Sequence, residues 1–114
     1  MDQLEKLRLL LGNSADEFED EQLELFLERA ESAIMDKRYP FLDWTETDES
    51  GNRVYPLESR YYSLQIEIAI ALFNRIGAEG EAQHTENGVY RTYQSGGDIP
   101  NELLNRVTPK AKVL

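Results

Sequence analysis

Few residues of this 114-residue chain have the types and spacing that catalysis requires. The single histidine, His84, falls in a polar stretch between Gly80 and Asn87, where a surface loop residue is expected rather than a catalytic base. The absence of cysteine excludes a thiol nucleophile, a disulfide scaffold and thiolate metal sites. No phosphate-binding glycine-rich loop, His-Glu-x-x-His or Gly-x-Ser-x-Gly sequence occurs. We therefore predict a protein that is not an enzyme and needs no cofactor.

Oxygen-bearing side chains gather in residues 43–52, and hard cations such as calcium prefer oxygen ligands. The order of these residues does not fit an EF-hand. A loop begun at Asp43 or Asp48 has no glycine at its sixth position and no glutamate at its twelfth. We therefore interpret the segment as an acidic loop without a metal, and a metal-assisted hydrolase acting through it is the third-ranked function.

The chain is strongly acidic, with a formal net charge of −10 at pH 7. Residues 1–60 contain 16 acidic and 7 basic side chains, whereas residues 61–114 contain 6 and 5. This balance argues against tight binding of duplex DNA, because neutralising phosphates requires clustered Lys and Arg. The longest apolar run, residues 68–73, is far shorter than the roughly 20 residues that cross a bilayer. Because Met1 is not followed by a secretory signal either, we expect a protein made in a cytoplasm and no membrane contact.

Two helices are predicted within residues 1–38. The first begins with a capping-box pair, Asp2 and Glu5, and ends at Gly12. Its apolar residues recur at three- and four-residue spacing: Leu4, Leu7 and Leu11. This spacing predicts a short helix with one buried face.

The second helix is predicted to follow a Ser14–Glu17 capping box and to end near Arg38, because Pro40 disfavours the helical conformation at the preceding residue. Its apolar residues share one face: Leu23, Phe26, Leu27, Ala30, Ala33 and Ile34. The opposite face is anionic: Glu21, Glu24, Glu28, Glu31 and Asp36. Glutamates at this spacing are more often a solvated surface than an acid–base pair.

The remainder of the chain alternates loops with short elements. Residues 39–56 read as a long acidic loop, and residues 57–77 as a central helix that is apolar almost all round. A strand is predicted at 86–94, after the Asn-Gly turn signal. A short helix at 98–107 and a flexible tail at 108–114 follow. The fold class is therefore mainly α, a single-domain bundle of three to four main helices with a short β-strand or hairpin after the third helix.

Several segments resemble the small head–tail connector (adaptor, or head-completion) proteins of long-tailed bacteriophages and prophages. The similarity covers nearly the whole chain, including a leucine-rich start and a helix like that of residues 23–34. Its specificity resides in an ordered series of short sequences: Asn74-Arg75-Ile76-Gly77-Ala78-Glu79-Gly80, Glu86-Asn87-Gly88-Val89-Tyr90-Arg91-Thr92-Tyr93, Ile99-Pro100 and Leu103-Leu104-Asn105-Arg106. The acidic loop around 43–52 and the C-terminal tail depart from the family pattern.

The resemblance implies a structural adaptor in the virion neck. Members of this family form rings, usually dodecameric, beneath the portal vertex, and are often monomeric until the portal templates assembly. The ring extends the DNA exit channel and docks a stopper or tail-completion protein. The implied partners are thus further copies of the chain, the portal and the next neck component, with DNA passing through unbound.

Three sets of residues are candidates for these contacts. The strand could pair with a neighbouring subunit through Val89, Tyr90, Arg91, Thr92 and Tyr93, although the tyrosines could instead cover the monomer's own bundle. Carboxylates that line the channel or face a partner are predicted at Glu21, Glu24, Glu28, Glu31, Asp48 and Glu49. The tail residues predicted to dock on the portal or another partner are Lys110, Lys112, Val113 and Leu114.

A second function fits the same composition. A small acidic helical protein can mimic DNA and sequester a DNA-binding protein, and the net charge of −10 permits this. Such a mimic would capture its partner in a strongly salt-sensitive way.

Overall fold

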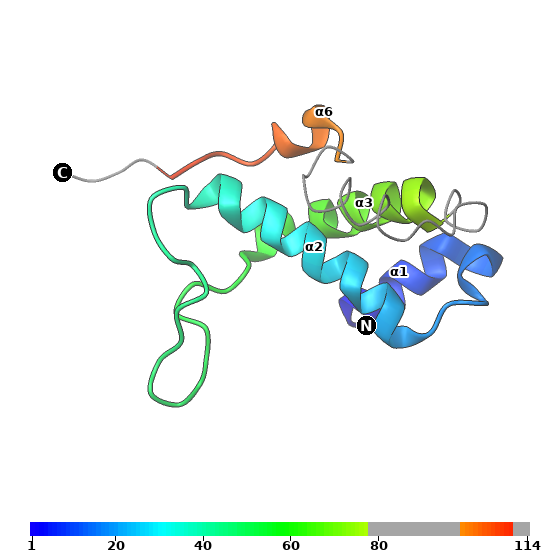
Figure 1. The fold of residues 1–114 in the computed structure, drawn as a ribbon, viewed down its shortest axis with the longest axis horizontal. Helices are drawn as coiled ribbons and strands as arrows, with labels where there is room; N and C mark the ends of the chain where they lie inside the picture. Colours follow the sequence, from blue (N-terminus) through cyan, green and yellow to red (C-terminus); the bar gives the residue numbers. More distant parts are fainter. Residues whose placement is uncertain (78–98, 111–114) are drawn as a thin grey trace.

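The computed structural model describes residues 1–77 and 99–110, which form a small helical bundle (Figure 1). The helices are α1 (Gln3–Leu11), α2 (Asp20–Arg38), α3 (Tyr62–Leu72) and α6 (Asn101–Leu104). Single turns of tighter or wider helix occur at η1 (Gly12–Ala15), η2 (Ser59–Tyr61) and η3 (Phe73–Gly77), the last of the π type. The mainly α fold is confirmed. The strand predicted at 86–94 lies outside the described residues.

The start and the end of α1 agree with the sequence. The backbone N–H of Glu5 donates to Asp2 Oδ1 at 2.8 Å, and the N–H of Asp2 donates to Glu5 Oε1 at 3.2 Å. Gly12 then adopts a φ of +59°, a conformation that a side chain disfavours. The capping box and the glycine stop predicted for this helix are thus both confirmed.

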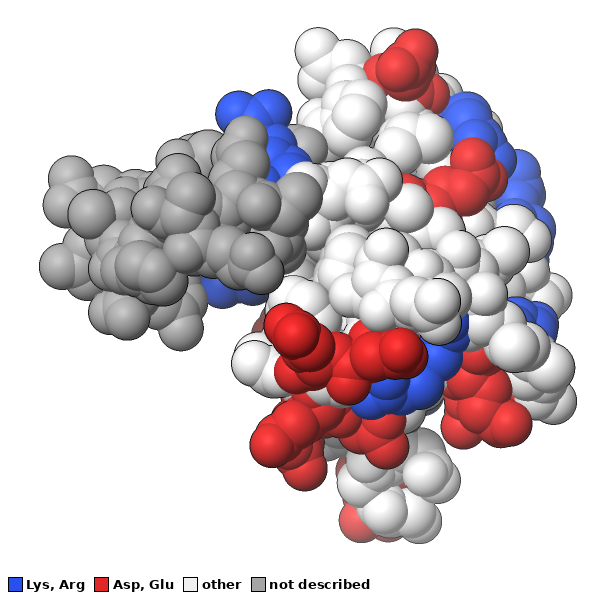
Figure 2. Space-filling model, turned by 90° about the vertical axis from the view of Figure 1, so that its right-hand side faces the viewer, with Lys and Arg blue, Asp and Glu red and all other residues white. Residues whose placement is uncertain are grey.

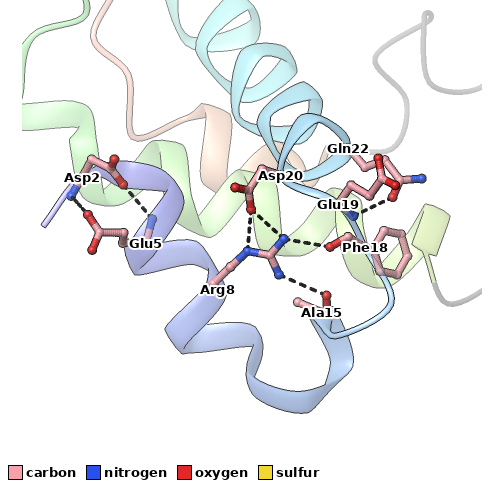
Figure 3. A network of polar contacts seen from close by, with 8 residues as sticks. All are labelled: Asp2, Glu5, Arg8, Ala15, Phe18, Glu19, Asp20 and Gln22. Carbon is pink, nitrogen blue, oxygen red and sulfur yellow. Dashed lines mark hydrogen bonds and ion pairs between the residues drawn. The ribbon is translucent and has the colours of Figure 1, made fainter.

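The predicted start of α2 is wrong. The helix begins at Asp20, and its N-terminal pair is Glu19 with Gln22, whose side-chain oxygen accepts the Glu19 N–H at 2.8 Å. The Ser14–Glu17 segment instead forms part of a tight turn, which Arg8 of α1 holds (Figure 3).

Arg8 donates to three acceptors in this turn. Its guanidinium binds the carbonyl of Ala15 at 3.2 Å, the carbonyl of Phe18 at 2.7 Å and Asp20 Oδ1 at 2.9 Å (Figure 3). Carbonyls that bind an arginine in this way belong to a bend rather than to a regular helical ladder. The tertiary contact therefore overrides the local capping signal.

The hydrophobic core lies between α2 and α3, with α1 and α6 packed against this pair. Fully buried side chains come from every part of the bundle: Leu7, Leu23, Ile34, Met35, Ile68, Leu72 and Val107. Burial of a side chain of this size stabilises the fold by about 1.5–3 kcal/mol. The predicted apolar face of α2 is confirmed, because its members are buried or, at Ala33, half-buried.

Helix α3 is the central helix, as its composition predicts, but it is not uniformly apolar inside. Gln65 is buried, donates to the Leu27 carbonyl at 2.9 Å and accepts from Gln3 Nε2 at 2.8 Å. This amide ties together α1, α2 and α3. Residues 56–58 precede the helix without joining it, so α3 begins later than predicted. None of the helices in the described ranges is both long and apolar enough to span a membrane.

Candidate interaction surfaces

The outer face of α2 carries the first set of predicted carboxylates. Glu21, Glu24 and Glu28 are exposed, as expected for a surface available to a partner. Figure 2 shows acidic side chains gathered beside a broad area of uncharged side chains, at the end of the molecule where α1 turns into α2. Glu31 differs, because its carboxylate forms an ion pair with Arg53 at 3.0 Å and is half-buried. Glu31 therefore helps to hold the loop in place and is less available to a partner than the other three glutamates.

Arg53 and Trp44 attach the acidic loop to the end of α2. The guanidinium of Arg53 lies 5.1 Å from the centre of the Trp44 ring, in a cation–π contact. The indole N–H of Trp44 donates to Asp36 Oδ1 at 2.7 Å. Together with the Glu31 ion pair, these contacts hold the beginning and the end of the loop against one helix.

The tip of the loop is also organised. Asp48 Oδ1 accepts the N–H groups of Ser50 and Asn52 at 2.8 and 2.9 Å, and Gly51 takes a φ of +85° to close the turn. Thr47 and Arg53 form an isolated antiparallel bridge. Residues 43–55 are therefore held largely by polar contacts, which composition alone did not predict. Glu49 remains exposed at the tip.

No group of carboxylates that could hold a metal ion occurs among residues 1–77 and 99–110. Asp43 illustrates why: the Thr45 hydroxyl and then the Thr45 N–H donate to its carboxylate and lower its pKa. Asp48 is likewise engaged by backbone N–H groups of its own turn. The carboxylates of this segment shape the loop instead of converging on one point.

Arg38 joins three segments at the C-terminal end of α2. Its guanidinium pairs with Glu58 at 2.7 Å, which raises its pKa above the usual range, and donates to the Thr108 carbonyl at 2.7 Å. The N–H of Lys110 donates to the Arg38 carbonyl at 2.8 Å. The tail predicted to be flexible from residue 108 thus makes hydrogen bonds with α2 as far as Lys110.

An apolar groove between α1 and α3 was not predicted. It has a volume of about 410 Å³, and Met1, Leu9, Leu10, Ile66 and Ile70 line it. Leu9 and Leu10 are 67% and 66% exposed. The signal was present in the sequence, because these two leucines fall outside the Leu4, Leu7 and Leu11 spacing of the buried face.

The sequence matches one known protein family. The sequence model of the phage gp6-like head-tail connector protein family matches residues 1–107. The chain belongs to this family. No curated protein and no solved structure matches the chain.

Membership in the connector family gives the general role of the chain. It is a structural component of a phage at the junction of head and tail, where connectors contact portal and tail proteins. The family is structural rather than enzymatic. The interpretation drawn from the ordered sequences between residues 74 and 106 is thus confirmed at the level of the family.

Some predicted contact residues of this connector lie outside the described part of the chain. These are the strand residues Val89, Tyr90, Arg91, Thr92 and Tyr93, and the tail residues Lys112, Val113 and Leu114. Among those described, Glu21, Glu24, Glu28, Asp48 and Glu49 are exposed, although Asp48 also accepts hydrogen bonds within its own turn. Glu31 is half-buried and paired with Arg53. The structure therefore leaves two separate acidic areas, the face of α2 and the tip of the loop.

Proposed function

We propose that this connector forms a homo-oligomeric ring, dodecameric in the virion, between the portal and the stopper or tail-completion protein. The ring extends the channel through which DNA leaves the head. The observation that carries the proposal is the family match over residues 1–107. The chain is synthesised in the cytoplasm of the bacterial host and joins the portal there, which templates assembly of subunits that are monomeric alone.

The exposed carboxylates of α2 and of the loop tip support a channel that does not hold DNA. Each phosphate gripped by Lys or Arg adds affinity, and an acidic surface avoids such contacts. Salt limits the repulsion between carboxylates and phosphates to about 8–10 Å. The exposed members of the predicted set are accordingly proposed to face the channel or a partner: Glu21, Glu24, Glu28, Asp48 and Glu49.

The C-terminal tail is the segment that we propose to dock on the portal. Because Lys110 is tied to Arg38, the four residues after it start from a fixed point of the bundle. These residues, Ala-Lys-Val-Leu, combine one cation with three apolar side chains. We assign them to the portal contact. A chain truncated after Lys110 should keep its far-UV circular dichroism and lose portal affinity, and undiminished portal binding contradicts the assignment.

Imaging tests the ring itself. The full-length chain is mixed with the portal protein of the same phage and examined by negative-stain electron microscopy. A ring of additional density on the portal is the expected result. Portals that stay bare at saturating connector, or phage heads that join tails normally after deletion of the gene, overturn the proposal.

A charge reversal tests the proposed strand contact. Arg91 lies between two tyrosines in the sequence, and we propose that it pairs with the acidic face of the neighbouring α2. Arg91→Glu then places like charges together and should prevent the ring on portals. Lys37→Glu makes the same change of charge on α2 and serves as the control. Rings that form equally with both variants contradict this interface.

A further inference from the structure

Two apolar patches of the described chain are exposed at different places in the fold. The first is the groove between α1 and α3, where Leu9 and Leu10 are two-thirds exposed. The second is the turn directly after α2, where Phe41 is 55% and Leu42 39% exposed. Exposed apolar area that is gathered in this way commonly marks a binding surface.

The second patch is held in place from both sides. On its N-terminal side Tyr39 is buried, with its ring 5.4 Å from the ring of Tyr55. On its C-terminal side Trp44 is fixed by the Asp36 and Arg53 contacts. The chain between these anchors has little freedom to bring Phe41 and Leu42 inward. Their exposure is therefore built into the fold, which lowers the ordering cost of binding.

We propose that the Phe41–Leu42 turn of one copy inserts into the α1–α3 groove of the next copy. This inference rests on the proposed ring. A patch that fits a different patch on an identical molecule makes a head-to-tail contact, and only such contacts generate rings. The two patches cannot be satisfied within one copy in this structure, because both remain exposed there.

Charge favours this pairing over a contact between two grooves. Two charged side chains lie in the groove wall. Glu67 is already paired with Arg106, whereas Lys6 forms no ion pair with the described residues. Asp43 and Glu46 follow the Phe41–Leu42 turn and are exposed. A groove that meets the turn thus brings a lysine toward carboxylates, whereas a groove that meets a second groove brings two lysines together. Copies of this chain therefore fit one another in one direction.

Engineered cysteines test the contact, since the chain has none of its own. The full-length double variant Leu10→Cys/Phe41→Cys is assembled on the portal, oxidised and run on a non-reducing gel. We expect a ladder of covalent dimers, trimers and larger species. An equal mixture of the two single variants should give dimers only, each containing one copy of either variant by mass spectrometry.

The control double variant is Leu10→Cys/Leu25→Cys, because Leu25 on α2 is as exposed as Phe41, at 57% against 55%. It should give no ladder. A second pair, Leu9→Cys/Leu42→Cys, guards against loss of the contact through removal of the Phe41 ring. Portal-bound rings that form with neither pair cross-linked overturn the contact while the proposed function stands. Absence of both rings and cross-links overturns both proposals, and homodimers of Leu10→Cys alone overturn the head-to-tail direction.

A polar substitution gives an independent measure. Phe41→Asp should weaken assembly on the portal about tenfold or more, as expected for loss of an aromatic anchor at an interface. Lys37→Asp, on the same end of α2, should leave assembly within about twofold of the unmodified chain. Equal assembly of Phe41→Asp and the unmodified chain contradicts the proposal.

Discussion

The bundle and the loop end of this connector are stabilised in different ways. Between α2 and α3 the contacts are almost all apolar, with Ile34, Ile68 and Leu72 fully or nearly fully buried. At residues 39–58 the chain is instead held by Arg38 and Arg53, through ion pairs with Glu58 and Glu31 and through the ring of Trp44. Apolar burial stabilises the entire domain, whereas the partly exposed polar contacts fix a local shape at a smaller gain in stability. The fold and the proposed binding surface therefore depend on separate residues.

The largest effect should come from the bundle. Ile68→Ala removes a side chain with no exposed area and should lower the free energy of unfolding by about 2–5 kcal/mol. For a small domain this is a large part of the total stability. Urea denaturation followed by circular dichroism measures it. Leu25→Ala on the outside of α2 is the control, with an expected change within about 0.5 kcal/mol. Equal losses for the two variants contradict the placement of the core.

An intermediate effect is expected at Arg38, where the bundle and the loop end meet. Arg38→Met leaves the Glu58 carboxylate and the Thr108 carbonyl without their donor, at a cost of about 1–3 kcal/mol. Lys37→Met is the control, because the neighbouring Lys37 makes no ion pair within the described residues. Urea denaturation of the two variants compares them. If both lose the same stability, the junction does not hold the tail.

A smaller and local effect is expected at Arg53. Arg53→Met removes the Glu31 ion pair and the stacking on Trp44, together worth about 0.5–1 kcal/mol at such a partly exposed site. Because Trp44 is the only tryptophan, its emission reports on the loop directly. We expect a red shift and stronger quenching by acrylamide, with unchanged far-UV circular dichroism. Arg60→Met removes a cation–π contact with Tyr61 and should leave the emission unchanged. Unaltered emission in Arg53→Met contradicts the loop anchor.

The sequence predicted the bundle better than it predicted the surfaces. Helical spacing identified the buried face of α2, since the residues that repeat every three or four positions are those that α3 covers. The capping box at Asp2 could also be predicted, because its two partners lie three residues apart in the sequence. The start of α2 could not be predicted in this way, because it depends on hydrogen bonds from Arg8 to the carbonyls of Ala15 and Phe18, seven and ten residues away.

The loop anchors and the apolar groove show a second limit of sequence reasoning. Composition marked residues 43–52 as acidic, but whether such a loop is fixed depends on Glu31, which helical spacing assigned to a free surface. Likewise, α1 carries leucines on more than one face, and only the position of α3 decides which of them stay exposed. For the predicted strand contact at residues 89–93, the prediction still stands on sequence alone.

The smallest effect should come from an ion pair on the bundle's surface, where polar contacts matter least. Arg106 donates to Glu67 at 2.7 Å and lowers the pKa of this carboxylate below its ordinary value of 4.5. A lowered pKa in the folded state means that the contribution to stability is complete above pH 4.5 and is lost as the pH falls through the folded value. The side chains are 49% and 45% exposed, so salt screens the pair strongly.

Glu67→Gln therefore tests whether the surface polar contacts of the bundle contribute as little to its stability as we expect. Its stability should fall slightly below that of the unmodified chain at neutral pH, and the difference should vanish as the pH drops below 4.5 or as salt is added. Glu102→Gln, an exposed carboxylate without an ion pair in the described residues, should show no such pH-dependent difference. Thermal unfolding at several pH values separates the two. If the lower stability of Glu67→Gln persisted in acid, the glutamate would act through packing and not through its charge. Surface side chains would then contribute more to the stability of the bundle than their exposure indicates.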